Sequence, residues 1–326
     1  GTLDDMADCD LVVEAVIEEM EIKRAVFAAL DSVVRPDAIL ATNTSYLDVN
    51  AIAAASSHPE RVAGLHFFNP AHVMKLVEIV DGERTAPDTV ATLLKLARTL
   101  GKIPVVAKVG EGFIGNRIFA AYRKQCEFLL EEGAFPQNVD EAMRGFGMAM
   151  GPFAVFDLAG LDVAWAMRKR LAPTRDPTAR YVEIADLLCG EGRFGRKTGK
   201  GWYDYASGTA RPDPHVEALI VEASAAKGIK RKLLDPAAIQ ARLLAAMINE
   251  AAWVLAEGVA ARPGDIDLVL VNGYGFPKLK GGVLHWAAHE DRAEIVRAVK
   301  EMAEASGVGI EVAANLEQVL DAAAHL

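Results

Sequence analysis

The sequence of 326 residues contains few cysteines, no long apolar run and fewer basic than acidic residues. Its three cysteines, Cys9, Cys126 and Cys189, lie far apart and match no metal-binding spacing, which excludes a disulfide framework and fits a reducing compartment. No stretch approaches the ~20 consecutive apolar residues of a membrane-spanning helix, so we expect no membrane span. The 45 acidic residues outnumber the 35 basic ones, and this balance argues against a nucleic-acid partner.

The chain also begins without methionine and without a signal peptide. Gly1 is followed within a few residues by an apolar, strand-like segment, so we expect a fragment of a longer protein. The alanine-rich composition and the lack of a targeting segment favour a bacterial cytoplasm. The terminal Ala324-His325-Leu326 loosely resembles a peroxisomal address, so a peroxisome is the alternative.

The first hundred residues alternate between strand-like and helix-like segments. Short apolar runs predict five strands, in DLVVEAVI, AILATNT, RVAGLHF, KLVEIV and IPVVAKV. Segments with helical periodicity, such as EMEIKRAVFAALDSVV and TVATLLKLARTLG, lie between them. This alternation predicts a doubly wound, mostly parallel sheet over residues 1–109. Helices dominate from residue 110 onward, so the expected class is α/β followed by all-α.

The helical part contains an internal repeat. A shift of 125 residues, without a gap, places Arg117 on Arg242, Glu132 on Glu257, Gly133 on Gly258, Asp140 on Asp265 and Pro152 on Pro277. We therefore expect a first helical domain at 110–206, a linker at 207–236 and a degenerate second copy at 237–326. The second copy has Ala241 where the first has Asn116, which suggests a function for Asn116 in the first copy alone.

Residues 110–115 match the G-x-G-x-x-G pattern of dinucleotide-binding turns. That motif also requires a second strand after the helix, with an acidic residue ~20 positions on. Here a further helical segment follows, and the acidic candidates Glu127, Glu131 and Glu132 lie on the first helix itself. We interpret the pattern as a false match, so the phosphate-binding turn must lie elsewhere or be missing.

His66 ends a predicted strand, where open α/β sheets place their ligands, and Glu78 lies 12 residues later on the next strand. A strand–loop–strand of this length can bring the two side chains together. A histidine oriented by a carboxylate suits general acid–base catalysis near neutral pH. Spacing alone favours a simpler alternative, in which His66 is a core histidine and Glu78 a salt-bridged strand residue.

Other polar residues lie near predicted strand or helix ends. Ser45 follows the second strand, where it suits either a ligand contact or a helix cap. Asn116 lies near the start of the helix after the glycines, where a capping or turn role is the alternative. Glu18 and Lys23 follow the first strand and could contact a ribose or phosphate, although position alone predicts ordinary solvated charges.

These motifs together resemble the 3-hydroxyacyl-CoA dehydrogenases of fatty-acid β-oxidation. The resemblance rests on DLVVEAV, ATNTS, GLHFFNP, VMKLVEI, GFIGNR, MGPF and FGRKTGKGWYDY, which occur in the family's order. It implies hydride transfer between NAD and C3 of a 3-hydroxyacyl-CoA. It also implies an incomplete Rossmann-type domain, whose phosphate-binding turn lies upstream of Gly1, followed by two duplicated helical dehydrogenase C-terminal domains.

The resemblance also assigns roles to single residues. His66 matches the histidine that takes the proton of the 3-hydroxyl, and Glu78 matches the carboxylate that orients it. Ser45 matches a serine that binds the substrate oxygen beside the cofactor, and Asn116 an asparagine that helps to place the substrate. The positions that match the lining of the NAD site are Val16, Ile17, Glu18, Lys23, Ser45 and Asn69.

The duplicated half resembles the multifunctional members of the family. This implies an enoyl-CoA hydratase region upstream and a thiolase partner, and we expect a homo-oligomer. Two alternatives to this function stay open. One is a dehydrogenase of the same fold that acts on a small hydroxy acid. The other is a non-catalytic acyl-CoA-binding or oligomerisation module formed by the helical repeats.

Overall fold

The computed structural model of the chain describes residues 1–325, which form two compact units. Unit 1 comprises Gly1–Phe119, Glu250–Ala288 and the C-terminal residues from Glu317. Unit 2 comprises Ala120–Asn249 and His289–Leu316. The last residue of the tripeptide that resembles a peroxisomal address, Leu326, lies outside the described residues.

Unit 1 is built on a five-stranded sheet in the order β1-β2-β3-β4-β5. Its strands are β1 (Leu11–Glu14), β2 (Ile39–Thr42), β3 (Val62–Phe67), β4 (Leu76–Asp81) and β5 (Ile103–Lys108). Only β3 and β4 pair antiparallel, and the other neighbours are parallel. The predicted, mostly parallel sheet is therefore confirmed, and β1 lies at one of its edges.

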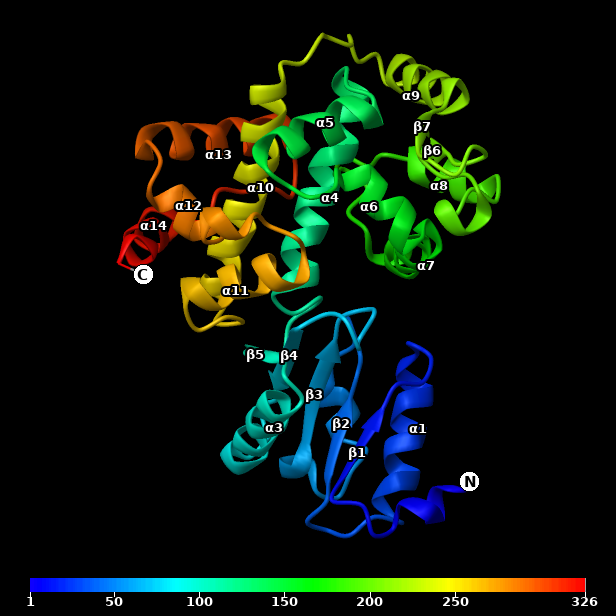
Figure 1. The fold of residues 1–326 in the computed structure, drawn as a ribbon, viewed down its shortest axis with the longest axis vertical. Coiled ribbons are helices and arrows are strands. Elements are labelled where there is room, and N and C mark those ends of the chain that lie inside the picture. The colour runs from blue at the N-terminus through cyan, green and yellow to red at the C-terminus, as the bar shows by residue number, and fades with distance from the viewer. Residues whose placement is uncertain (326) are drawn as a thin grey trace. The chain divides into compact units, whose positions relative to one another are not determined.

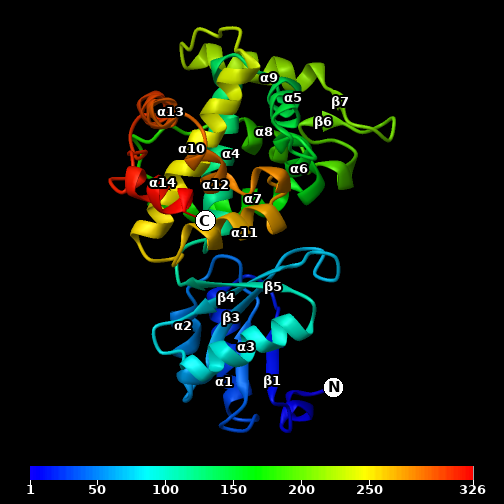
Figure 2. The ribbon, with the colours of Figure 1, turned by 60° about the vertical axis from the view of Figure 1, so that its left-hand side comes forward.

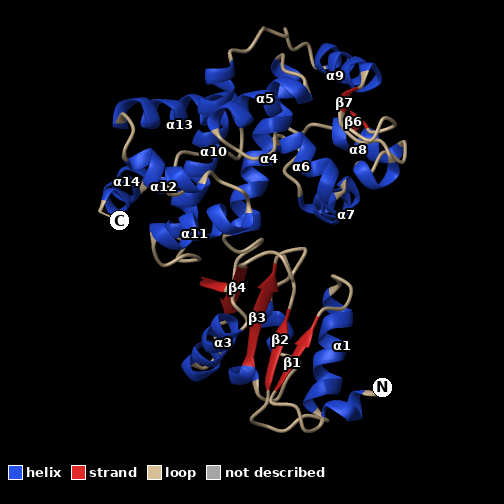
Figure 3. Ribbon diagram, in the orientation of Figure 1, coloured by secondary structure: helices blue, strands red, loops and turns tan. Residues whose placement is uncertain are grey.

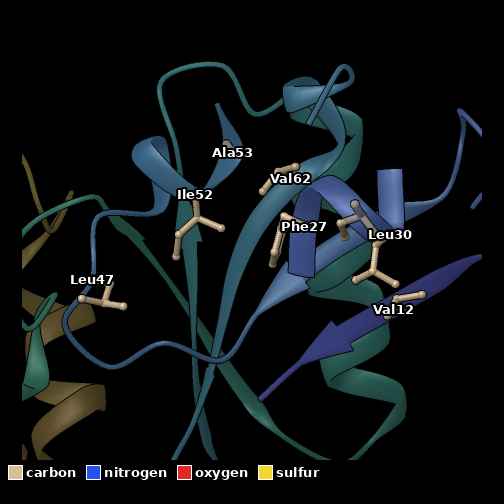
Figure 4. Close-up of a cluster of buried hydrophobic side chains, with 8 residues drawn as sticks. Val12, Phe27, Leu30, Leu47, Ile52, Ala53 and Val62 are labelled. Atoms are coloured by element: carbon tan, nitrogen blue, oxygen red, sulfur yellow. The ribbon is translucent and has the colours of Figure 1, made fainter. Parts of the chain in front are cut away.

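Helices cover both faces of this sheet. They are α1 (Met20–Asp31), α2 (Val49–Ala53) and α3 (Pro87–Thr99), and Figures 1 and 2 show α1 and α3 on opposite sides. Because side chains alternate along a strand, β2 and β3 each contribute to both of two apolar clusters. The cluster under α1 and α2 (Figure 4) comprises Val12, Phe27, Leu30, Leu40, Leu47, Ile52, Ala53 and Val62. The cluster under α3 comprises Ile39, Ala41, Ala63, Leu65, Val77, Ile79, Leu93 and Ala97.

Helices make up most of the rest of the chain (Figure 3). Those that lie wholly or mainly in unit 2 are α4 (Gly115–Glu132), α5 (Pro136–Phe146), α6 (Pro152–Ala159), α7 (Leu161–Leu171), α8 (Ile184–Gly190), α9 (Pro214–Ala226), α10 (Pro236–Ala256) and α13 (Arg292–Ser306). Unit 2 also contains a short antiparallel pair, β6 (Tyr203–Asp204) and β7 (Arg211–Pro212). Unit 1 contains α11 (Pro263–Gly273), α12 (Val283–Ala288) and most of α14 (Leu316–Ala324). Among residues 1–325, no helix has both the length and the apolar character needed to cross a membrane.

The segment predicted as a linker, residues 207–236, includes helix α9. Its side chains at Val216, Ile220 and Ser224 are buried, so this segment is packed rather than open. The ends of the segment are polar and contain proline, which is typical of a linker, and for this reason the sequence did not predict the helix between them. The predicted domain boundaries near residues 109, 206 and 236 were placed from the sequence repeat. The two units are defined by spatial contacts instead, and each combines separate stretches of the chain. The units therefore do not test those boundaries, which stay a prediction.

The repeat requires a gap, so the ungapped alignment is wrong beyond its first helix. Helix α5 begins at Pro136, three residues after Gly133, whereas α11 begins at Pro263, five residues after Gly258. From these helices on, the matching shift is 127 residues, since 263 − 136 = 127.

The capping aspartates identify the corrected register. Asp140 on α5 accepts hydrogen bonds from the N–H groups of Phe153 and Ala154 in the first turn of α6. Asp267 on α11 accepts from two N–H groups in the first turn of α12, those of Leu284 and His285. Asp140 therefore pairs with Asp267 and not with Asp265.

Where the 125-residue shift holds, the two copies make matching contacts. In unit 1, Arg117 of α4 donates from Nη2 to Glu257 at 2.8 Å. In unit 2, Arg242 of α10 donates from Nη2 to Glu132 at 3.3 Å. The second partners of these arginines, which the same shift also superimposes, are Glu250 and Gln125. The equivalent arginine of each copy therefore binds equivalent positions in the other copy. Such reciprocal contacts are the pattern of an isologous interface.

Replacement of either capping aspartate should destabilise the protein. Asp140→Ala and Asp267→Ala each remove the acceptor for two helix-terminal N–H groups, which costs about 1–2 kcal/mol. Asp265→Ala removes an ion pair with the exposed Arg262 and should cost less than about 1 kcal/mol. Because burial raises the pKa of both caps to about 6, urea unfolding at pH 8 compares the ionised forms. A loss for Asp265→Ala equal to that for Asp267→Ala would favour the ungapped register.

Candidate active site

The antiparallel pairing of β3 with β4 places His66 directly opposite Glu78. His66 Nδ1 lies 2.8 Å from Glu78 Oε2, and the two residues are 4% and 0% exposed. The expected contact between these side chains is therefore present. It also fits the simpler alternative, a core histidine beside a carboxylate, so the surroundings of the pair must distinguish the two interpretations.

The second oxygen of Glu78 binds the start of helix α4. Glu78 Oε1 accepts hydrogen bonds from Ile114 N–H at 3.2 Å and Gly115 N–H at 3.0 Å. Helix N-termini favour such an acceptor because their first N–H groups lack partners within the helix and the helix dipole attracts negative charge. One buried carboxylate thus orients His66 and anchors α4.

This geometry explains the glycine pattern at 110–115. The pattern forms the turn before α4, in which Gly112 and Phe113 take left-handed φ values of 74° and 50°. Its amides bind a carboxylate of the protein, and the element after α4 is another helix, α5. Both observations support the interpretation of the pattern as a false dinucleotide match.

The imidazole of His66 is held in an apolar setting. The rings of Phe68 and Phe113 lie with centroids 4.6 Å and 5.7 Å from it. Because Nδ1 faces a carboxylate, the hydrogen-bond pattern assigns the proton to Nδ1 and leaves Nε2 as the nitrogen that can accept a proton. A fixed tautomer of this kind is what proton transfer to or from a ligand requires.

Ser45 is positioned by Glu18. Glu18 Oε1 accepts hydrogen bonds from the Thr44 hydroxyl at 2.6 Å and from the N–H groups of Ser45 and Tyr46 at 2.8 Å and 3.0 Å. The expectation of an ordinary solvated charge is therefore wrong for Glu18, which organises the loop after β2. Within residues 1–325 the Ser45 hydroxyl makes no hydrogen bond, so it is available to a ligand.

Lys23 is also not a solvated charge, because its side chain is only 1% exposed. Its Nζ lies 2.7 Å from Glu14 Oε1 and donates to the carbonyl of Val16 at 3.2 Å. Glu14 is itself buried and accepts from the Thr42 hydroxyl through its other oxygen. A buried carboxylate needs a counter-ion, so Lys23 is held inside and fixes the carboxyl end of β1.

Asn116 joins the Ser45 loop to a residue that the motifs did not indicate. Its Nδ2 lies 3.5 Å from the carbonyl of Ser45, and its Oδ1 accepts a hydrogen bond of 2.7 Å from the Tyr274 hydroxyl. Since Gly115, the preceding residue, binds Glu78, the four predicted catalytic residues belong to one connected set of contacts. Asn69 is exposed in the loop after β3 and lies outside that set.

The end of β1 suits one part of NAD. Val13, Val16 and Ile17 are 41%, 42% and 60% exposed and give this strand end an apolar surface, which fits a flat ring. The turn after β1 reads AVIEE and contains no glycine, so it offers no cradle for a pyrophosphate. Within the described residues, the end of β1 therefore suits the nicotinamide part of NAD and not its pyrophosphate.

Two family models match the chain. The NAD binding domain of 3-hydroxyacyl-CoA dehydrogenase matches residues 1–119, and its C-terminal domain matches residues 112–205. The crystal structure of the dehydrogenase part of multifunctional enzyme 1 from Caenorhabditis elegans is 30% identical, with a TM-score of 0.58 over 92% of this chain and 73% of that one. The chain belongs to the 3-hydroxyacyl-CoA dehydrogenase family.

Other members of the 3-hydroxyacyl-CoA dehydrogenase family extend this likeness. The 3-hydroxybutyryl-CoA dehydrogenase of Escherichia coli is 29% identical with a TM-score of 0.81, over all of this chain and 84% of that one. The peroxisomal bifunctional enzyme of Cavia porcellus is 46% identical over 302 residues, which are 88% of this chain and 42% of the relative. The chain thus spans about two fifths of the length of the curated relatives it matches. It has the architecture of the family, a Rossmann-like sheet followed by a largely helical dehydrogenase domain.

Sequence reasoning missed Tyr274, which lies 158 residues from Asn116. No sequence motif links Tyr274 to Asn116, and the ungapped repeat did not indicate a function for Tyr274. Burial raises the pKa of Tyr274 well above its ordinary value, and the charges of Glu78 and Tyr46 add to the effect. The phenol therefore stays neutral over the ordinary pH range and can act as a hydrogen-bond donor.

Glu78→Ala should destabilise the protein more than Glu78→Gln. Alanine leaves His66 and two N–H groups of α4 without their acceptor, and each unsatisfied buried group costs about 1–3 kcal/mol. Glutamine keeps one carbonyl oxygen for the helix terminus. We expect free energies of unfolding from urea titration to differ by at least about 2 kcal/mol between the two variants. Equal losses would mean that Glu78 does not anchor α4.

Proposed function

We propose that the chain carries the NAD-dependent 3-hydroxyacyl-CoA dehydrogenase activity of a fatty-acid β-oxidation enzyme. The observation that carries this proposal is the buried contact of His66 Nδ1 with Glu78 at 2.8 Å, in a chain of the dehydrogenase family. The substrate is a 3-hydroxyacyl-CoA thioester, and the product is the 3-oxoacyl-CoA. The free Ser45 hydroxyl and the amide of Asn116 supply hydrogen-bonding groups within the same set of contacts.

His66 acts as the acid–base group in this proposal. Its Nε2 accepts the proton of the 3-hydroxyl, while Nδ1–H stays on the Glu78 carboxylate, which stabilises the imidazolium that forms. NAD, when bound, supplies the acceptor for the hydride that leaves C3. In the reverse direction His66 returns the proton to the oxygen on C3.

Ser45 and Asn116 hold the substrate. The Ser45 hydroxyl donates to the oxygen on C3, and Asn116 Nδ2 donates to an oxygen of the thioester substrate. Val16, Ile17 and Asn69 line the NAD site directly. Glu18 and Lys23 contribute mainly by holding the strand end and the Ser45 loop in place, because their charges already bind groups of the protein.

The remaining sequence-based expectations are also part of this proposal. The helical part is a duplication. The names of the relatives, peroxisomal bifunctional enzyme and peroxisomal fatty acid beta-oxidation multifunctional protein, support a further activity beside the dehydrogenase. This activity is an enoyl-CoA hydratase upstream in our proposal. The same names favour a peroxisome over the bacterial cytoplasm that composition suggested. A thiolase partner and a homo-oligomer stay predictions.

His66→Ala in the full-length protein should lower kcat for acetoacetyl-CoA reduction by about 10²–10⁴-fold, because it removes the general acid. The matched control is His72→Ala, at an exposed loop histidine, which should keep the activity of the wild type. The measurement is the steady-state loss of NADH absorbance, with free acetoacetate as a second substrate. Near-normal turnover by His66→Ala would end the assignment, and equal use of free acetoacetate would favour the small-hydroxy-acid alternative.

A second candidate function is non-catalytic binding of acyl-CoA by unit 2. A cavity of about 400 Å³ in that unit has apolar walls that include Phe128, Met167 and Leu171. Basic residues, among them Lys124 and Arg175, also line it. An apolar cavity with cationic groups suits a ligand that has a long acyl chain and an anionic head. None of the predicted catalytic residues lies in this cavity, so the two functions are separable.

Met167→Trp should weaken the binding of palmitoyl-CoA at least about tenfold, because the larger side chain takes up part of the space that the acyl chain would occupy. Val163→Trp, on the same helix but 63% exposed and outside the cavity, is the control. Isothermal titration calorimetry gives the affinities, and acetoacetyl-CoA reduction should be unchanged in both variants. Unaltered palmitoyl-CoA binding by Met167→Trp would remove this second candidate.

A further inference from the structure

Tyr274 reaches the predicted active site from the second helical copy. It follows α11 and packs within unit 1 against Phe68 and Phe119, with ring centroids 5.6 Å and 5.1 Å away. A Cβ atom on Gly115 would lie 2.3 Å from the tyrosine ring, so only glycine at this position allows the approach. The hydroxyl then meets Asn116 Oδ1 at 2.7 Å.

Two contacts together fix the place and the orientation of the Asn116 amide. Oδ1 can only accept, and it faces the Tyr274 hydroxyl, which donates. Nδ2 can only donate, and it faces the carbonyl of Ser45. In the flipped amide, Oδ1 would face that carbonyl, acceptor against acceptor. The Tyr274 hydroxyl, which can donate or accept, holds the Asn116 side chain at the place where the Ser45 carbonyl makes this choice, and without it only the long contact of 3.5 Å would hold the amide there.

The tyrosine hydroxyl is particular to the second copy. The turn after α5 is closed by a bond from Met148 N–H to the carbonyl of Met143, five residues back. The turn after α11 is closed by a bond from Phe276 N–H to the carbonyl of Leu270, six residues back. Tyr274 lies in this longer turn, and the corresponding residues of the first copy are Phe146 and Gly147, which have no hydroxyl.

We propose that Tyr274 is a positioning residue of the dehydrogenase reaction, which holds the Asn116 side chain at the place where its Nδ2 faces Ser45 and the substrate. The inference rests on the proposed function. The second copy, which has Ala241 in place of the asparagine, thus contributes a side chain to the site of the first. The helical repeat is a part of that site and not only a support for it.

A double-mutant cycle on the full-length protein tests this role, with Tyr274→Phe, Asn116→Ala and the double variant. Tyr274→Phe keeps the ring packing and removes one hydrogen bond, so the protein should still fold, with only a small fall in the urea midpoint. With acetoacetyl-CoA and NADH, we expect kcat to fall about tenfold and KM for NADH to stay constant. In the Asn116→Ala background the same substitution should have no further effect. Tyr181→Phe, which loses a hydroxyl bonded to Asp186 in unit 2, should keep full activity.

Equal losses in both backgrounds, or no loss at all, would overturn the positioning role and leave the dehydrogenase function intact. A wild-type protein without turnover would instead overturn the proposed function. In that case the affinity of the same four proteins for acetoacetyl-CoA decides the role of Tyr274: non-additive losses support it and additive losses refute it. A protein that neither reduces nor binds the thioester would refute both.

Discussion

A single buried carboxylate holds the site together. Glu78 uses one oxygen for the imidazole of His66 and the other for the first amides of α4. The sheet and the helix are therefore tied through the same group that orients the proposed acid–base residue. Asn116 follows those amides directly in the chain, so its position also depends on Glu78. Such a group has little freedom to change, because any replacement affects a helix terminus and a histidine at once.

The other acidic residues near the strand ends play a similar structural part. Glu14 binds Lys23 beneath the end of β1, and Glu18 gathers the amides after β2. Both carboxylates already bind groups of the protein. The groups left for a ligand are therefore the Ser45 hydroxyl, the Asn116 amide and apolar side chains. This arrangement keeps the loops in fixed positions before any ligand arrives, which lowers the cost of ordering them on binding.

Much of this could be predicted from the sequence where the signal is local. Strand runs and helix periodicity predicted the five-stranded sheet. Strand spacing allowed His66 to meet Glu78, and the resemblance to the family made that contact the expectation. What the sequence could not indicate depends on contacts between distant segments. The second use of Glu78 needs the amides of α4, 36 residues away, and the burial of Lys23 needs Glu14 on a strand. The role of Tyr274 also escaped, because small insertions between the copies shift the register by two residues and then lengthen one turn.

Unit 1 is assembled from separate stretches of the chain, and α11 packs on β4 and β5 from far downstream. Gly273 lies against Leu76 and Phe68, at the strand end beside His66. During synthesis the sheet leaves the ribosome long before this covering helix exists. Until then the apolar end of the sheet has no partner from its own chain. The surroundings of the histidine are therefore complete only after α11 has been synthesised, and until then the exposed apolar surface favours aggregation.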